Sequence, residues 1–169
     1  TSSSAASDVY KRQSLYSGSF KTFFLPDGMI GDSLPTAIGD DLNGSIGTVP
    51  GTDSPGATKF NEIAKSNNFK AGPYTKESYD SAALIMLAMQ AANSTNSNDF
   101  KSKVMDVANA PGEKIFPGEL AKGLKLLSEG KEIDYVGASA VELIGGGESA
   151  GNFAEILIDN QKVTTVGYK

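Results

Sequence analysis

The sequence predicts an α/β fold, because helix-like and strand-like hydrophobic patterns occupy different parts of the chain. Apolar residues recur at helical spacing between residues 57 and 128, whereas they alternate along the chain after Lys131. Two short apolar runs, residues 20–25 and 44–49, are bounded by Pro and Gly and predict strands ahead of the helical region. We therefore expect helices in the middle of the chain and strands toward both ends.

The helices are expected from apolar spacing and from Pro and Gly at their ends. Residues 78–92 give the clearest helix, which is apolar nearly all round, so we expect it to be buried on most sides. A helix at 99–108 is ended by Pro111 and Gly112, and the last one is ended by Gly130. The full set of expected helices is residues 33–39, 57–67, 78–92, 99–108 and 117–128.

The segment beyond Lys131 is expected to be rich in strands, because its apolar side chains follow a period of two. Asp159 and Asn160 lie between two of these runs, where a tight hairpin needs residues that tolerate positive φ. The alternating residues are Ile133, Tyr135, Val141, Leu143, Phe153, Ile156, Ile158, Val163 and Val166.

Composition excludes several classes of function. The chain has 169 residues with 15 Lys and Arg against 20 Asp and Glu, and its positive residues are scattered, so we expect no nucleic-acid partner. Cysteine and histidine are both absent, which excludes disulfides, thiolate nucleophiles and a Ser-His-Asp triad. The longest apolar stretch, residues 82–92, falls well short of the roughly 20 residues that span a bilayer.

The first thirteen residues, TSSSAASDVYKRQ, show no apolar periodicity. From Ser3 to Gln13 they resemble the in-frame translation of a transposase-type sequencing adapter, so we expect residues 1–13 to be non-native. The alternative is an ordinary polar terminus. In both cases the segment takes no part in the fold argument.

Four segments in series resemble type I periplasmic solute-binding proteins for branched-chain and other hydrophobic amino acids, the group typified by Leu/Ile/Val-binding proteins. The resemblance covers the second half of such a protein and depends on the order and spacing of the four segments together. They are FFLPDGM at 23–29, LNGSIGTVPG at 42–51, GPYTKESYDSAALIMLAMQAA at 72–92 and GELAKGLKLLSEGKEIDYVGASA at 118–140.

The resemblance implies an incomplete type I periplasmic-binding-protein fold, with parts of two Rossmann-like lobes joined by hinge strands. Residues 14–45 are then part of the C-terminal lobe and residues 46–134 are part of the N-terminal lobe. Residues 135–169 are then the return crossing and the terminal β-hairpin of the C-terminal lobe. We expect the missing part to carry a signal peptide and half of the ligand site.

The function that this resemblance implies is binding, without catalytic residues, metal or cofactor. The protein would capture a branched-chain or other hydrophobic amino acid in the cleft between its lobes and deliver it to the membrane permease of an ABC transporter. It would be periplasmic, and monomeric at full length. The exact ligand stays open between leucine, isoleucine or valine and another amino acid, an amide or urea.

Three residues are candidates for ligand binding. A buried amino-acid zwitterion needs a carboxylate for its ammonium group, and Asp27 follows a strand at the end where α/β folds present ligand contacts. The resemblance implies that Asp27 pairs with the ammonium, that Gly28 allows close backbone approach, and that Tyr74 walls the side-chain pocket. The alternatives are a plain turn residue for Asp27 and a rim residue covering the helix start for Tyr74.

Tyr79 and Asp80 match the family's helix opening but are not expected to touch ligand. We expect Tyr79 to pack, and we expect Asp80 to act as a first-turn charge that favours the helix dipole.

Two other functions compete with transport. The glycine-rich run GGGESA at 145–150 fits a dinucleotide-binding pattern after an apolar run, but a strand-like segment follows it and Glu148 would repel phosphate, which favours a hairpin turn. A receptor's ligand-sensing domain, or an amide-binding or urea-binding regulator, would reuse the same architecture. The absence of an apolar span after the last expected hairpin favours the free carrier, and such a span further along the gene would favour the receptor.

Overall fold

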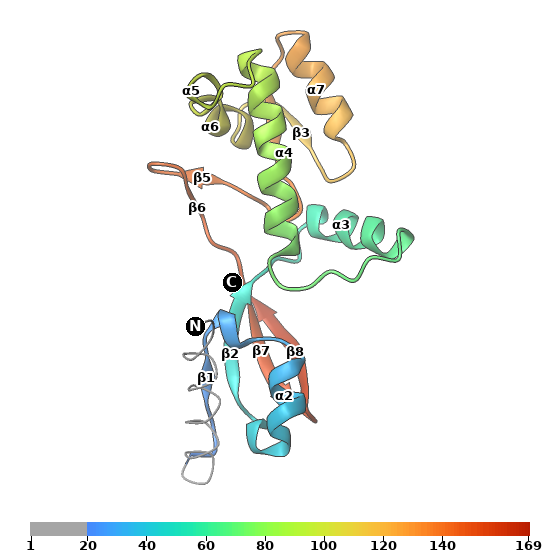
Figure 1. Ribbon diagram of the computed structural model, residues 1–169, viewed down its shortest axis with the longest axis vertical. Helices are drawn as coiled ribbons and strands as arrows, with labels where there is room; N and C mark the ends of the chain where they lie inside the picture. The colour runs from blue at the N-terminus through green and yellow to red at the C-terminus, as the bar shows by residue number, and fades with distance from the viewer. Residues whose placement is uncertain (1–19) are drawn as a thin grey trace, which may run out of the picture. The chain divides into compact units, whose positions relative to one another are not determined.

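The structure is a computed structural model that describes residues 20–169 (Figure 1). The expected adapter-derived residues 1–13 lie outside the described residues. Contacts divide the described residues into two compact units: unit 1 combines residues 20–50 with Phe153–Lys169, and unit 2 is Gly51–Asn152. The expected lobe boundaries, after residues 45 and 134, differ from these two positions, and the assignment of the units to lobes of a complete protein stays a prediction.

Unit 1 contains a four-stranded mixed sheet in the order β1-β2-β7-β8 (Figure 1). Strand β1 (Phe24–Leu25) runs parallel to β2 (Ile46–Pro50), and β2 pairs antiparallel with β7 (Phe153–Asp159). Strand β7 then pairs antiparallel with β8 (Lys162–Tyr168). The strands expected before and after the helical region are therefore confirmed, although β1 is shorter than the apolar run that predicted it.

One face of this sheet forms the core of unit 1. Along β7 the side chains alternate, so that Ala154, Ile156 and Ile158 are buried. They are covered by helix α2 (Ser33–Ile38) and the 3-10 helices η1 (Asp27–Met29) and η2 (Gly39–Leu42). The core cluster consists of Leu25, Ile30, Leu34, Leu42, Ile156 and Ile158.

The β7–β8 hairpin turns one residue later than expected. Asp159 is already paired with Lys162, and the two loop residues are Asn160 (φ 49°) and Gln161 (φ 60°). Two consecutive residues with positive φ match the twist of a two-residue hairpin. Asn160 tolerates this conformation, as its type predicted, and Gln161 adopts it as the second residue of the two-residue loop between the paired Asp159 and Lys162.

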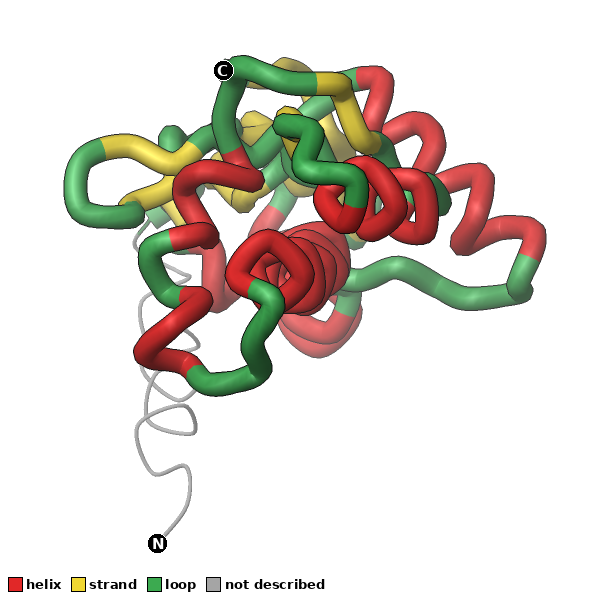
Figure 2. Tube along the Cα trace, turned by 90° about the horizontal axis from the view of Figure 1, so that it is seen from above, coloured by secondary structure: helices red, strands yellow, loops and turns green. Residues whose placement is uncertain are grey.

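Unit 2 is built around the long helix α4 (Thr75–Ala92), which Figure 2 shows nearly end-on. Helices α3 (Pro55–Ser66), α5 (Ser97–Phe100), α6 (Lys103–Ala108) and α7 (Leu120–Ser128) accompany it, together with the parallel strands β3 (Glu113–Ile115) and β4 (Ile133–Tyr135). Helix α4 buries Ala83, Leu84, Leu87 and Ala88 in the core.

Helix α4 is not buried on most sides, so that prediction is wrong. Ile85 and Met86 are 44% and 42% exposed on the opposite side from the core. Apolar residues lie nearly all round this helix, but the described part of the chain supplies packing partners for one face only.

Two local predictions also differ from the structure. The helix expected at 99–108 is interrupted into α5 and α6, although Lys101 and Ser102 keep right-handed helical backbone angles. Strand β3 was not expected, because its first two residues, Glu113 and Lys114, are charged and exposed and only Ile115 is buried. A single buried residue gives no alternating pattern to detect.

The glycine-rich run forms a hairpin between β5 (Leu143–Ile144) and β6 (Glu148–Ser149). Gly145 and Gly147 have φ values of 53° and 105°, which favour glycine. The strand β7 follows this hairpin, whereas a dinucleotide-binding loop opens a helix whose N-terminus takes the phosphates. The hairpin prediction is confirmed, and the basis for the nucleotide-binding alternative is removed.

Candidate functional site

Asp27 lies in a turn beyond the end of β1, separated from it by one residue, as expected. The side chain of buried Ser45 accepts a hydrogen bond from the Phe23 backbone N–H at 3.2 Å, which holds the start of β1 against β2. Pro26 keeps the chain extended, with φ −69° and ψ 160°, and the 3-10 turn of η1 then begins at Asp27. The turn is closed by the Ile30 N–H, which donates to the Asp27 carbonyl at 3.0 Å, and Ile30 is buried.

The carboxylate of Asp27 is exposed and available. Its Oδ1 accepts a hydrogen bond from the Gly28 N–H at 2.7 Å, which fixes the side chain close to its own backbone. Within residues 20–169 it has no salt-bridge partner. A carboxylate held by one backbone donor and open on its other oxygen can accept an ammonium group.

Gly28 lies in the same turn as Asp27, and a Cβ built there would meet no atom within 4 Å. Its backbone therefore faces open space, which is compatible with the close approach of a ligand. Asp27 and Gly28 are thus brought together by η1, and both lie in unit 1.

Tyr74 lies in unit 2, at the N-terminal end of α4. Its side chain is 41% exposed, and its backbone is left-handed with φ 62° and ψ 6°. A non-glycine residue in this region is uncommon and often marks a constrained site. Two hydroxyls stabilise the bend: the Thr75 Oγ1 donates to the Gly72 carbonyl at 2.8 Å, and the Ser78 Oγ donates to the Tyr74 carbonyl at 2.8 Å.

An apolar pocket of about 420 Å³ opens beside the start of α4. Thr75 and Ser78 line it, but their hydroxyls donate to backbone carbonyls. No charged side chain lines this pocket, so it offers no partner to either end of an amino-acid zwitterion. Its lining is Phe60, Ile63, Ala64, Asn67, Phe69, Thr75, Ser78 and Tyr79.

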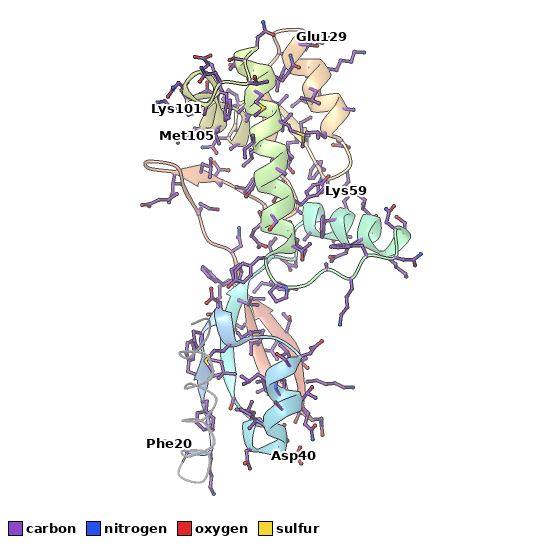
Figure 3. The ribbon with its side chains drawn as sticks, in the orientation of Figure 1. Phe20, Asp40, Lys59, Lys101, Met105 and Glu129 are labelled. Atoms are coloured by element: carbon purple, nitrogen blue, oxygen red, sulfur yellow. The ribbon has the colours of Figure 1, made fainter. Side chains whose placement is uncertain are left out.

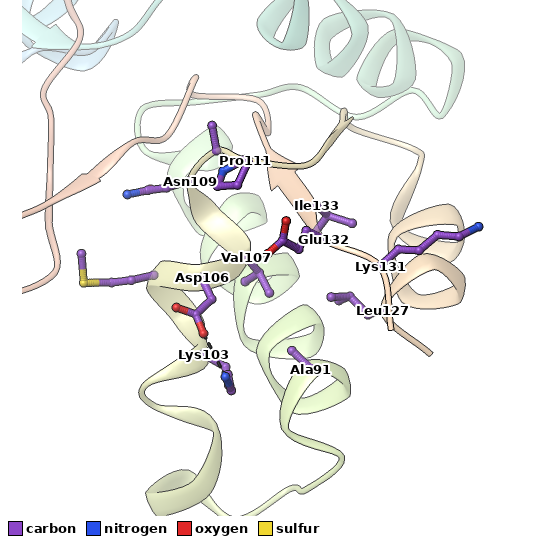
Figure 4. A pocket seen from close by; sticks show the side chains of 12 residues that line it. Ala91, Lys103, Asp106, Val107, Asn109, Pro111, Leu127, Lys131, Glu132 and Ile133 are labelled. Carbon is purple, nitrogen blue, oxygen red and sulfur yellow. Dashed lines mark hydrogen bonds and ion pairs between the residues drawn. The ribbon is translucent and has the colours of Figure 1, made fainter. Parts of the chain in front are cut away.

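A second pocket, of about 450 Å³, lies between α6, α7 and β4 (Figure 4). Lys103 at its edge forms an ion pair with Asp106 at 3.0 Å, and Lys131 forms one with Glu129 at 2.8 Å. Both cations are therefore already neutralised by neighbouring acids. This pairing leaves the pocket a weak candidate for an anionic ligand.

The most extensively bonded carboxylate of the described residues is Asp80, whose role the sequence did not reveal. Its side chain is 2% exposed and accepts four hydrogen bonds. Oδ1 accepts from the Tyr135 hydroxyl at 2.9 Å and from the Ala138 N–H at 2.8 Å. Oδ2 accepts from the N–H and the hydroxyl of Ser139, at 2.7 and 2.5 Å.

The expected helix-dipole role of Asp80 is therefore wrong. Helix α4 begins at Thr75, so Asp80 lies beyond its first turn and faces the protein interior. Burial, and next to it the Asp80 charge, raise the pKa of Tyr135, which keeps that hydroxyl a donor. The signal in the sequence was a single acid in an apolar helix, whose partners lie 55 or more residues away.

Tyr79 packs, as expected. Its ring contacts the Phe60 ring edge-on, with centroids 5.2 Å apart, and its hydroxyl accepts a hydrogen bond from the Gly118 N–H at 3.0 Å.

Beside it Lys59, labelled in Figure 3, lies 4.3 Å from the centre of the Phe116 ring and 3.4 Å from the Glu119 carboxylate. The Phe116 N–H donates to Glu119 at 3.0 Å and, with Lys59, lowers the pKa of Glu119.

Among residues 20–169 no group of three or more acids is placed to hold a metal ion. In the same range no helix combines the length and the apolar character that a membrane crossing requires.

The chain is similar to known proteins mainly in its fold. No family model matches the sequence. It is 28% identical over 97 residues to the chemotactic signal transduction system substrate-binding protein BasB of Halobacterium salinarum, covering 57% of this chain and 24% of that protein. The structure resembles the leucine-binding protein LivK of Thermotoga maritima, with a TM-score of 0.67 and 17% identity, over 95% of this chain and 40% of that one.

These similarities show part of a type I periplasmic-binding-protein fold, which confirms the expected fold class. The chain spans 40% of the length of LivK and 24% of the length of BasB. Both similar proteins are described as binding proteins and neither as an enzyme.

Proposed function

We propose that this chain is part of a solute-binding protein that captures a branched-chain or other hydrophobic amino acid. The observation that carries the proposal is the exposed Asp27 carboxylate, which has no salt-bridge partner within residues 20–169 and follows a strand end in this fold. An ammonium group is the ligand chemistry that such a carboxylate recognises best. Asp27 is proposed to pair with the α-ammonium of the ligand, while the Gly28 backbone allows close approach.

Tyr74 is proposed to contact the side chain of the ligand. Its exposed ring supplies apolar area with a polar tip, and its left-handed backbone is held by two side-chain hydrogen bonds. A rigid aromatic residue loses little conformational entropy on binding, so it suits a pocket wall.

The wider role follows from the same proposal. The protein would work in the periplasm as a monomer and deliver its amino acid to the permease of an ABC transporter, without catalysis and without a cofactor. The similarity to a leucine-binding protein supports the class of ligand, and it extends over the fold at low sequence identity.

Calorimetric titration with leucine and two analogues tests this proposal in the gene product that contains these residues. 3-Methylbutylamine keeps the ammonium group and lacks the carboxylate, whereas 4-methylpentanoate keeps the carboxylate and lacks the ammonium. Leucine should bind, and 4-methylpentanoate should bind at least about 30-fold more weakly, because an unpaired buried charge costs about 2–5 kcal/mol. Equal affinity for leucine and 4-methylpentanoate would contradict the role of Asp27.

A sensing role is a second candidate, favoured by the match to a substrate-binding protein of a chemotactic signal transduction system. The ligand chemistry at Asp27 would be the same, and the partner would be a signal transducer in place of a permease. Crosslinking of the ligand-loaded gene product in its native membranes distinguishes the two, by whether a permease or a transducer is captured.

A further inference from the structure

The turn at residues 137–140 is strained and is held in place by Asp80. Gly137 and Ala140 both have positive φ, of 63° and 53°, and the two residues between them donate to the Asp80 carboxylate. The carboxylate fits closely against this turn, because a Cβ at Gly137 would lie 2.5 Å from Asp80 Oδ1. An alanine in the left-handed region persists only where its surroundings impose it.

The same turn is hydrogen-bonded to the last residue of unit 2, which is hydrogen-bonded in turn to the first residue. The Asn152 side-chain amide donates to the carbonyls of Ser139 at 3.4 Å and Ala140 at 3.5 Å. The Gly51 N–H donates in turn to the Asn152 carbonyl at 3.0 Å. Gly51 and Asn152 are the first and last residues of unit 2, so the network reaches both segments through which the chain enters and leaves it.

Asp80 also belongs to the helix that begins directly after Tyr74. Helix α4 runs from Thr75, and the Tyr79–Phe60 contact and the Tyr79 hydrogen bond to Gly118 fix the same part of it. The start of α4 is therefore held in place by contacts with other parts of unit 2. Helix α4 and a series of hydrogen bonds, the longest of them at 3.4 and 3.5 Å, join the residue after Tyr74 to Gly51 and Asn152.

We propose that Asp80 is a positioning residue that couples Tyr74 to the two connecting segments at Gly51 and Asn152. This inference rests on the proposed function for its use of the Tyr74 contact, whereas the network itself can be tested without ligand. Binding at Tyr74 would be transmitted through α4, the turn at 137–140 and Asn152, because the helix backbone and hydrogen bonds join these elements.

The test is residue-resolved amide hydrogen exchange of the gene product and its Asp80→Asn variant, with Asp134→Asn, at a half-buried acid of β4, as the matched control. Asparagine keeps one acceptor oxygen and places an NH₂ group where the other oxygen was. A hydroxyl can rotate to accept from this group, but the backbone N–H of Ala138 or Ser139 that faces it loses its acceptor, which should loosen the turn. Without ligand, exchange at the Ala138 and Ser139 amides should accelerate about tenfold relative to a core amide of α4. The Gly51 amide should accelerate with them, and the control should change none of the three.

The Gly51 amide decides the outcome, since a merely local role of Asp80 would leave it unchanged. Faster exchange at Ala138 and Ser139 with unchanged exchange at Gly51 would overturn the coupling. Ser139→Ala serves if Asp80→Asn does not fold, because it removes one hydroxyl donor and keeps the backbone N–H; it should give a smaller acceleration at the same amides.

Addition of leucine completes the test. In the wild type leucine should slow exchange at 137–140 and at Gly51, and Asp80→Asn should abolish this effect while protection near Tyr74 persists. Leucine-induced protection at 137–140 that survives in Asp80→Asn would overturn the coupling. A wild type that shows no response to leucine would contradict the proposed function, and the ligand-free exchange would still decide on the network.

Discussion

Replacement of Gly137 by alanine should be far more destabilising than the same replacement at Gly130. Both glycines have positive φ, 63° and 72°, so both variants carry the backbone cost of about 1–2 kcal/mol for a left-handed alanine. A Cβ at Gly130 meets no atom within 4 Å, whereas one at Gly137 lies 2.5–2.6 Å from three atoms of the Asp80 carboxylate. The two substitutions therefore differ mainly in this contact.

The size of the difference follows from the hydrogen bonds that Asp80 must give up. The carboxylate has to move away from a new Cβ, and withdrawal of Oδ2 alone breaks its two bonds to Ser139. Hydrogen bonds to charged groups contribute about 1.5–3 kcal/mol each. We expect Gly137→Ala to lower the free energy of unfolding by about 3 kcal/mol more than Gly130→Ala.

Equilibrium urea denaturation of both variants measures this difference, and a double-mutant cycle assigns it to Asp80. In an Asp80→Ala background the carboxylate is gone, so Gly137→Ala should cost only about as much as Gly130→Ala. Equal costs of the two glycine substitutions in the wild-type background, within about 0.5 kcal/mol, would refute the account of this contact.

Two pH dependences follow from the shifted pKa values. Burial and the Asp80 charge raise the pKa of Tyr135 above its ordinary 10.0, so the stability that Tyr135 contributes is present below about pH 10 and is lost as the pH rises further. Absorbance titration of tyrosinate should show one late-titrating tyrosine, and Tyr135→Phe should remove it. A normal titration of every tyrosine would contradict this prediction. The pKa of Glu119 is lowered from 4.5, mainly by the hydrogen bond from the Phe116 N–H, so the stability that Glu119 contributes is present above about pH 4.5 and is lost below it. In urea denaturation between pH 3 and 7, the free energy of unfolding should fall less steeply toward acid pH for Glu119→Gln than for the wild type. Identical pH profiles would count against the shift.

The fold class could be predicted because local patterns specified most of its elements. Alternation predicted β7 and β8, and apolar spacing with Pro and Gly boundaries predicted α3, α4 and α7. Strand β3 could not be predicted, since its pairing with β4 depends on a partner in another part of the sequence. The burial of α4 was overestimated because periodicity reports which faces are apolar and not which faces have partners.

In the candidate site, features that depend on partners far away in the sequence were again the ones that could not be predicted. A Pro-Asp-Gly turn after an apolar run placed Asp27 at a strand end, and this position is confirmed, while its role in binding stays a prediction. The role of Asp80 could not be read from its neighbours in sequence, because every donor to its carboxylate comes from residues 135–139. Long-range hydrogen bonding of this kind leaves no period and no motif.

The most direct test of the account is the leucine affinity of the gene product after Asp27→Asn, measured by calorimetry beside Asp41→Asn. Asparagine keeps an oxygen that can accept from the Gly28 N–H, so the turn should persist while the charge is lost. Asp41 is an exposed acid of the same unit and serves as the control. We predict a loss of leucine affinity of at least about 30-fold for Asp27→Asn and none for Asp41→Asn; an unchanged affinity for Asp27→Asn would contradict the central claim.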